Sequence, residues 1–237
     1  MGADSGILRY MSSIDQIASI VVAALCFVPA IVFHEVAHGL MAHALGDDTA
    51  KRAGRLTLNP AKHIDPFGTV LLPLLMAMMQ GPVFGYAKPV PYNPANLKNP
   101  RVGDVLVGIA GPAANLVMAL LGAALMWVLL PMARATLGAG DTGLFYYFYL
   151  WFLPQFTVIN LYLLFFNLLP IPPLDGSSIF AILVPDRYLE TYYNIERYAM
   201  PVFMVVAFVI PAVTGFNPFG AYLNATAGNL ADFLLPL

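Results

Sequence analysis

His34, Glu35 and His38 form an HExxH motif, in which two histidines stand four positions apart and a glutamate follows the first. At about 100° per residue, the two imidazoles would lie roughly 40° apart on one face of a helix. This spacing suits two ligands on one zinc ion, with Glu35 beside them to take a proton from water. A random shuffle of this composition would produce the motif with a probability on the order of one in a thousand. The motif therefore predicts a catalytic zinc site rather than two structural histidines.

A catalytic zinc ion takes three protein ligands and keeps one position open, so a third ligand is needed. Asp175 is the strongest candidate, because it follows Pro170, Pro172 and Pro173 at the end of a long uncharged stretch. Prolines forbid regular helix, and a carboxylate placed by such a break suits a buried metal site. The alternative is that Asp175 only caps a helix that begins at Ser177.

Five other side chains could supply the third ligand: His43, Asp47, Asp48, His63 and Asp65. His63 and Asp65 are the main alternative to Asp175, although the loop that carries them is basic. His43 would lie about 180° around the helix from His34, and so it would face away from the motif. Asp47 and Asp48 follow a glycine past the expected end of the helix and are predicted to form a solvated turn.

Another segment combines small residues with one amide: Gly108, Gly111 and Asn115, continued by Ala119 and Gly122. Small residues near i, i+4 spacing let another backbone approach closely, and Asn115 offers an amide within an apolar helix. Tight helix packing and contact with a substrate are equally compatible with this pattern. Asn115 is also a candidate donor to the oxyanion of a substrate.

The composition predicts an integral membrane protein. The 237 residues are 59% hydrophobic and only 10% charged, whereas about a quarter of residues are charged in water-soluble domains. This composition excludes a disordered chain and a coiled coil, which need low hydropathy and charge respectively. A net charge of −2 gives no basic excess for nucleic acid, and a single cysteine excludes a disulfide scaffold.

Uncharged stretches predict an all-α polytopic membrane protein with about four to six transmembrane helices. The stretches are residues 17–33, continuing as helix to 45, and residues 105–130, 142–174 and 198–231. The last is predicted to divide at Gly215 and Pro218 into a span and a C-terminal interfacial helix. No cleavage pattern precedes His34, so the first stretch is expected to remain in the mature protein. One membrane domain is expected over residues 1–237, with a core of 14–184 and C-terminal helices in 187–237.

Residues 66–87 are ambiguous, because prolines break this apolar segment and it could either span or dip in and return. Seven of the eleven basic residues lie in the two connections that flank it: Lys51, Arg52, Arg55, Lys62, Lys88, Lys98 and Arg101. By the positive-inside rule both connections are cytoplasmic, which favours a re-entrant segment. Residues 55–58 and 84–94 have strand-like composition, so small β elements are expected in these cytoplasmic-side loops.

Together these residues resemble the site-2 protease family of intramembrane zinc metalloproteases. The HExxH motif, the small-residue segment 108–115 and Leu174-Asp175-Gly176 occur in the order found in that family. Segments 54–60 and 87–91 are similar to its compact bacterial and archaeal members, and the resemblance covers residues 32–182. Larger members carry a PDZ or CBS domain, and no segment here is long and polar enough for either.

The resemblance implies an endopeptidase that cleaves transmembrane segments or signal-peptide remnants with one Zn²⁺ held by His34, His38 and Asp175. Glu35 would act as general base and then protonate the leaving amine. A multi-pass protein of a prokaryotic cell membrane is implied, with the active site toward the cytoplasm, a transmembrane substrate as partner and no nucleic acid.

Two alternatives are a catalytically silent scaffold that binds transmembrane peptides and a metal transporter. The intact base and ligands speak against the scaffold. The lack of charged residues in the other confident spans speaks against the transporter.

Overall fold

The computed structural model describes residues 13–71, 88–140, 143–172, 174–185 and 205–236, with isolated residues between 187 and 203. These residues form helices and connecting loops, and none of them lies in a strand, so the all-helical prediction is confirmed for this part of the chain. Within it, three helices are long and apolar enough to cross a membrane. They are Val21–Ala44 within α1 (Ser13–Ala44), α4 (Pro100–Gly138), and Leu144–Asn167, which comprises α5 (Leu144–Tyr147), η5 (Phe148–Phe152) and α6 (Leu153–Asn167).

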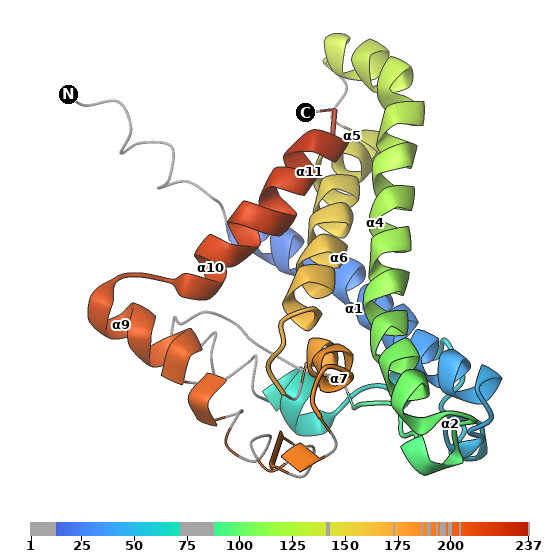
Figure 1. Ribbon diagram of the computed structural model, residues 1–237. Coiled ribbons are helices and arrows are strands. Elements are labelled where there is room, and N and C mark those ends of the chain that lie inside the picture. Colours follow the sequence, from blue (N-terminus) through green and yellow to red (C-terminus); the bar gives the residue numbers. More distant parts are fainter. Residues whose placement is uncertain are drawn as a thin grey trace.

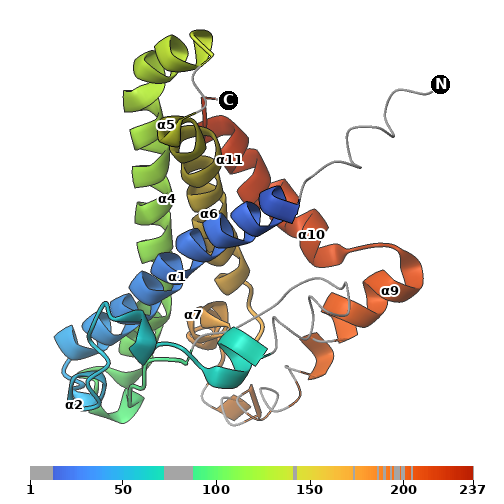
Figure 2. The same ribbon diagram turned by 180° about the vertical axis from the view of Figure 1, so that it is seen from behind.

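The long helix α4 packs against both α1 and α6 (Figure 1). Its 39 residues span about 58 Å at 1.5 Å per residue, which exceeds the thickness of a bilayer core. The helix begins at Pro100, and the Asn99 side chain caps it by accepting a hydrogen bond from Val102 N at 3.2 Å. Seen from behind, α1 passes obliquely across α4 and α6 (Figure 2).

Small residues bring α4 and α6 together, which is one of the two roles that the sequence leaves open for them. A Cβ at Gly122 of α4 would lie 2.6 Å from Oγ1 of Thr157 on α6, so only glycine permits this approach. Ala119 packs beside it with Leu161 and Leu164 of α6. The site is therefore built on closely packed helices rather than on flexible loops.

The C-terminal segment divides where the sequence predicts. α9 ends at Thr214, where Gly215 adopts the left-handed region with φ of 72°. A second helical stretch begins at Pro218 and packs Ala227 and Ala231 into the α4–α6 core. The pieces are α9 (Ile210–Thr214), followed by α10 (Pro218–Leu223), η7 (Asn224–Gly228) and α11 (Asn229–Leu234).

The loops that flank residues 72–87 meet at one end of the molecule. Lys88 N donates to His63 O at 2.9 Å, and Lys98 N donates to Leu45 O at 3.1 Å. The chain therefore returns at residue 88 to the place that it left at residue 63. Most of the ambiguous segment 66–87 lies outside the described residues, which include only a π-helical turn at η3 (Pro66–Leu71).

The prediction of strands is wrong for residues 55–58 and 88–93, which form irregular loops. Side chains take the place of a β-ladder there. The Arg55 guanidinium donates to the carbonyl oxygens of Lys88 at 2.5 Å and Pro89 at 3.3 Å. These carbonyls are satisfied without a partner strand, so the proline-rich sequence needs no sheet.

Candidate metal centre

His34 and His38 lie one turn apart on α1 and face α4. Their Nε2 atoms are 3.0 Å apart, and the two rings are nearly perpendicular, with an interplanar angle of 83°. Both side chains are buried, with exposed fractions of 5% and 9%. The same-face placement that the motif predicts is therefore found in the structure.

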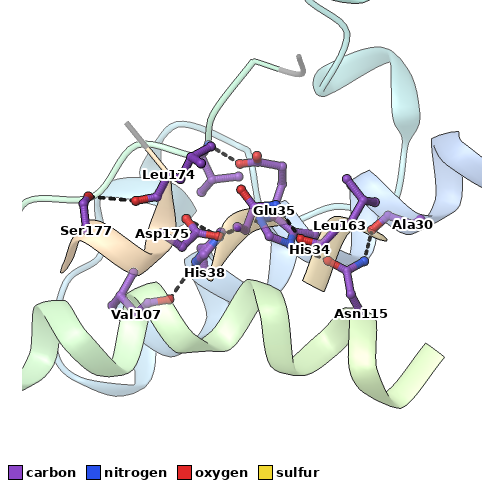
Figure 3. A network of polar contacts seen from close by, with 12 residues as sticks. Ala30, His34, Glu35, His38, Val107, Asn115, Leu163, Leu174, Asp175 and Ser177 are labelled. Carbon is purple, nitrogen blue, oxygen red and sulfur yellow. Dashed lines mark hydrogen bonds and ion pairs between the residues drawn. The ribbon is translucent and has the colours of Figure 1, made fainter. Parts of the chain in front are cut away.

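Asp175 opens the short helix α7 (Asp175–Ala181) after the proline-rich turn that follows α6. Its carboxylate meets both imidazoles, with Oδ2 3.1 Å from His34 Nε2 and Oδ1 3.3 Å from His38 Nε2 (Figure 3). The N-cap position of α7 is taken by Leu174 and Asp175 already lies within the helix, which speaks against the alternative role of Asp175 as a helix cap. A Cβ at Gly176 would lie 2.5 Å from Leu168 O, so glycine permits the tight turn that delivers Asp175.

Two glycines of α4 form the wall of this cluster. A Cβ at Gly111 would lie 2.6 Å from Cε1 of His34 and equally close to Cε1 of His38. One turn earlier, a Cβ at Gly108 would lie 3.1 Å from the backbone oxygen of Asp175. The lack of side chains at the glycines of this segment therefore lets the two imidazoles and α7 lie close to α4, in addition to the neighbouring helix α6.

The outer nitrogen of each imidazole faces an oxygen. Nδ1 of His34 is 2.6 Å from Oδ1 of Asn115, and Nδ1 of His38 is 2.6 Å from the backbone oxygen of Val107 (Figure 3). A carbonyl oxygen only accepts, so each neutral imidazole carries its proton on Nδ1. Each Nε2 then presents a lone pair to the centre of the cluster, as metal-binding histidines do.

In the neutral imidazoles, the Nε2 lone pairs of His34 and His38 thus meet the carboxylate of Asp175, and none of these three groups offers a proton to the others. Oδ2 of Asp175 is buried and accepts no hydrogen bond from any described residue. Two atoms that each lie about 2.0–2.1 Å from a tetrahedral zinc ion are about 3.3 Å apart. The observed separations of 3.0, 3.1 and 3.3 Å are close to this value. The donor set therefore fits one zinc ion, and a cation would relieve the repulsion among the lone pairs.

Glu35 lies beside the cluster without joining it. Its Oε2 accepts a hydrogen bond of 2.8 Å from the backbone N–H of Val90, in the loop after residue 87. The Glu35 side chain is partly exposed, and Asp175 keeps 20% of its side chain exposed. Water can therefore reach the side of the cluster where Glu35, the predicted general base, lies.

Asn115 lies at the cluster, but its amide hydrogens are both engaged. Nδ2 donates to Ala30 O at 3.1 Å and to Asn160 Oδ1 at 2.9 Å, and the residue is completely buried. No hydrogen remains for a substrate oxyanion in this arrangement. The geometry favours a role in orienting His34 over the predicted contact with substrate.

The other predicted ligands do not join the cluster. His43 pairs with Asp48 at 2.7 Å. His63 Nε2 lies 2.8 Å from Thr57 O, and Asp65 accepts a hydrogen bond from Gly68 N at 2.6 Å.

The prediction of a solvated turn is wrong for Asp47, which is completely buried. Its Oδ1 accepts hydrogen bonds from Thr49 N at 3.1 Å and Asn96 Nδ2 at 2.8 Å, and its Oδ2 accepts one from Asn93 N at 2.7 Å. The carboxylate therefore joins two loops, a role that spacing along one helix does not reveal.

Sequence reasoning missed three partners of the site: Val90, Val107 and Asn160. The first two act through backbone groups, which no residue type reveals. Asn160 does leave a signal, because it is an amide within the uncharged stretch 142–174, and buried polar groups in such stretches need partners.

No family model matches this sequence, and no solved structure matches it. Several curated proteins are similar to it in sequence. The chain is 45% identical over 178 residues to "Putative zinc metalloprotease YwhC" of Bacillus subtilis, an alignment that covers 75% of each protein. It is 31% identical over 217 residues to "Putative zinc metalloprotease Rip2" of Mycolicibacterium smegmatis, covering 84% of this chain and 75% of the relative. The protein of the same name from Mycobacterium tuberculosis is 31% identical over 186 residues, covering 77% of this chain and 64% of the relative.

Proposed function

The chain belongs to the site-2 protease family of zinc metalloproteases, and from this premise we propose that it is an intramembrane endopeptidase that cleaves transmembrane segments of other proteins. The observation that carries the proposal is the convergence of His34, His38 and Asp175 beside Glu35, at the end of a helix long and apolar enough to cross a membrane. Zinc is the metal that the names of the relatives imply.

In this proposal His34, His38 and Asp175 hold the zinc ion and leave one side open. Zinc bound there supplies Lewis acidity, which activates water and polarises the scissile carbonyl. Glu35 takes the proton of the attacking water and later delivers it to the leaving amine. The hydrogen bond from Val90 N to Oε2 of Glu35 at 2.8 Å holds the carboxylate in place, while its other oxygen remains available to the water.

The arrangement of the helices supports a site that opens toward the cytoplasm. The end of α1, the start of α4 and the end of α6 lie at one end of the molecule, together with α7 (Figure 1). The loops that carry the seven basic residues are joined at the same end, where Lys88 N donates to His63 O and Lys98 N donates to Leu45 O. Because basic loops stay in the cytoplasm, a substrate would be cut near the cytoplasmic face of the membrane.

The test is the substitution Glu35→Gln in the full chain, co-expressed with a single-span membrane reporter. The amide cannot take a proton, so cleavage is expected to fall at least 100-fold. Bound zinc, measured on purified protein by mass spectrometry, is expected to stay near one equivalent. His43→Gln is the matched control, since His43 lies on the same helix outside the cluster, and it should leave cleavage unchanged.

Unchanged cleavage by Glu35→Gln would overturn the assignment of the base. Asp175→Ala tests the third ligand separately, because loss of the carboxylate should remove most of the bound zinc. Full zinc occupancy in that variant would exclude Asp175 as a ligand.

A further inference from the structure

Two buried asparagines join three helices behind the metal cluster. Asn115 of α4 and Asn160 of α6 are both completely buried. Asn115 Nδ2 donates to Asn160 Oδ1 at 2.9 Å and to Ala30 O of α1 at 3.1 Å, and Asn160 Nδ2 donates to Phe156 O at 2.8 Å. Buried amides are unfavourable unless their hydrogen bonds are made, and this chain of hydrogen bonds makes them.

The backbone oxygens at the two ends of this hydrogen-bond series can only accept, so they fix which atom of each amide donates. Phe156 O requires the nitrogen of the Asn160 amide, so Oδ1 of Asn160 must face Asn115. Two acceptors, Ala30 O and Asn160 Oδ1, then require the nitrogen of Asn115 and use both of its hydrogens. Oδ1 of Asn115 is left to face the imidazole.

The last link reaches the metal cluster. Oδ1 of Asn115 lies 2.6 Å from Nδ1 of His34, and only a protonated Nδ1 can satisfy it. In neutral His34 the proton is then on Nδ1, and the lone pair is on Nε2. His38 has no such relay, because its Nδ1 meets the Val107 oxygen directly.

We propose that Asn160 is a positioning residue that acts through Asn115 to hold His34 in the Nδ1–H tautomer, and so keeps the Nε2 lone pair of His34 directed at the metal. The relay makes one ligand of the site depend on α6, although α6 itself supplies no ligand. The identity of the metal as zinc rests on the proposed function, whereas the tautomer rests on the hydrogen bonds alone.

The first experiment compares Asn160→Leu with the parent protein. Asn160→Leu leaves Ala30 O as the one remaining described acceptor for the Asn115 nitrogen, so the amide is held by one hydrogen bond instead of two and is freer to turn over and present its nitrogen to His34. Nδ1 of His34 then becomes an acceptor, and the proton moves to Nε2, which can no longer bind a metal. Outer partners of metal ligands typically contribute 10–100-fold to affinity, so zinc affinity, measured by competition with a chelator, is expected to fall about tenfold or more.

Thr157→Val is the matched control for this experiment. Thr157 is completely buried on α6, one turn from Asn160, and faces Gly122 rather than the cluster. Its substitution removes a buried polar atom from the same helix interface without touching the relay. Zinc affinity of Thr157→Val should stay within about twofold of the parent, whereas an equal loss in both variants would mean that α6 packing alone explains the effect.

A second background separates positioning from packing. In the Asn115→Asp variant both side-chain oxygens at position 115 accept, so His34 keeps Nδ1–H whichever residue stands at position 160. Asn160→Leu should therefore weaken zinc binding in the parent background and have little further effect when it is combined with Asn115→Asp. A loss of the same size in both backgrounds would overturn the relay.

The tautomer itself can be measured on the metal-free full chain. The protein has four histidines, and ¹⁵N-histidine NMR distinguishes Nδ1–H from Nε2–H. We expect Nδ1–H for His34 in the parent protein, and Nε2–H or a mixture in Asn160→Leu. Nε2–H at His34 in the parent would overturn the inference even if zinc binds. Because this measurement uses the parent protein, it tests the tautomer even if the variants fail to fold. Nδ1–H in a parent that binds no zinc would contradict the proposed function and leave the relay standing.

Discussion

The imidazoles of His34 and His38 have little freedom to turn. Each is held at Nδ1 by an oxygen 2.6 Å away, and Gly111 lies against both rings. Such confinement keeps two lone pairs aimed at one point before a metal arrives. A preorganised donor set loses little conformational entropy on binding, which favours high affinity.

Gly111→Ala should therefore damage the site severely. The added methyl would lie about 2.6 Å from Cε1 of each imidazole, so both rings would have to move. Overpacking of this kind typically costs about 1–3 kcal/mol, and a cost of this size borne by the zinc-bound form would lower zinc affinity by about 5- to 150-fold. Chelator competition measures the loss. Gly138→Ala on the same helix is the control, because no described atom beyond its chain neighbours and its own helix backbone lies within 4 Å of the added Cβ, and the zinc affinity of this variant should not change.

At the scale of elements, the position of α7 decides whether Asp175 reaches the histidines. The Arg101 guanidinium, at the start of α4, donates to Ile182 O at 2.9 Å and also to Val184 O, just past the end of α7. Gly108 admits the start of α7, as described above, and Tyr192 donates to Ser177 O at 2.7 Å. The third ligand is thus delivered by a helix anchored at both ends.

Arg101→Gln should loosen this helix. Hydrogen bonds from a charged donor contribute about 1.5–3 kcal/mol, so amide exchange in α7 is expected to become at least tenfold faster. Mass spectrometry of deuterium uptake measures the change, with α6 as an internal reference. Arg134→Gln, an exposed arginine of α4, is the control. Unaltered exchange in α7 after Arg101→Gln would show that the other contacts suffice.

Asp47 fixes the junction between α1 and the loop before α4, and its contribution should depend on pH. Burial would raise the pKa of the carboxyl, but hydrogen bonds from Asn96, Thr49 and Asn93 lower it to about 2. A folded pKa below the unfolded value of about 3.9 stabilises the protein fully above that value, and the stabilisation is lost as the pH falls through about 2.

Asp47→Asn should accordingly lower the thermal unfolding temperature in detergent at about pH 6, because an amide nitrogen would face the donor Asn93 N or Asn96 Nδ2. The difference from the parent protein should shrink as the pH falls from about 4 toward about 2. A difference that stays constant over this range would show that the charge of Asp47 contributes nothing.

The elements differ in how well the sequence predicts them. Absence of charge located the three long helices, and the HExxH spacing placed His34 and His38 together, because both are properties of a single helix. The prediction that Asp175 lies beside His34 and His38 came from the family resemblance and from the prolines that precede Asp175. The Asn115–Asn160 contact could not be predicted from spacing, because it depends on how two helices are rotated against each other.

For the whole molecule, the hydrogen bond between Lys88 N and His63 O sets the topology that we propose. Because this hydrogen bond joins residue 63 to residue 88, the proposed topology places both residues on the same side of the membrane. The start of α4 then lies on the same side of the membrane as the end of α1. In this topology α1, α4 and Leu144–Asn167 cross the membrane, since these are the described helices that are long and apolar enough to do so.

Cysteine labelling in intact cells tests this topology. In a Cys26→Ser background, Ala139→Cys should react with a membrane-impermeant maleimide from outside. Lys51→Cys should react only after the membrane is permeabilised, since the basic end is cytoplasmic. Labelling of both positions from the same side would exclude the proposed arrangement. The parent protein is the control, because Cys26 is completely buried and should stay unlabelled.

The distance along the chain between the HExxH motif and Asp175 has a consequence for biosynthesis. A ribosome that has delivered α1 to the membrane has made the base and two ligands, but the third ligand is still to be translated. Until α6 and α7 have been inserted and docked, the nascent chain lacks a complete donor set. For the proposed protease, the order of the residues would therefore prevent cleavage of neighbouring nascent helices until its own fold is complete.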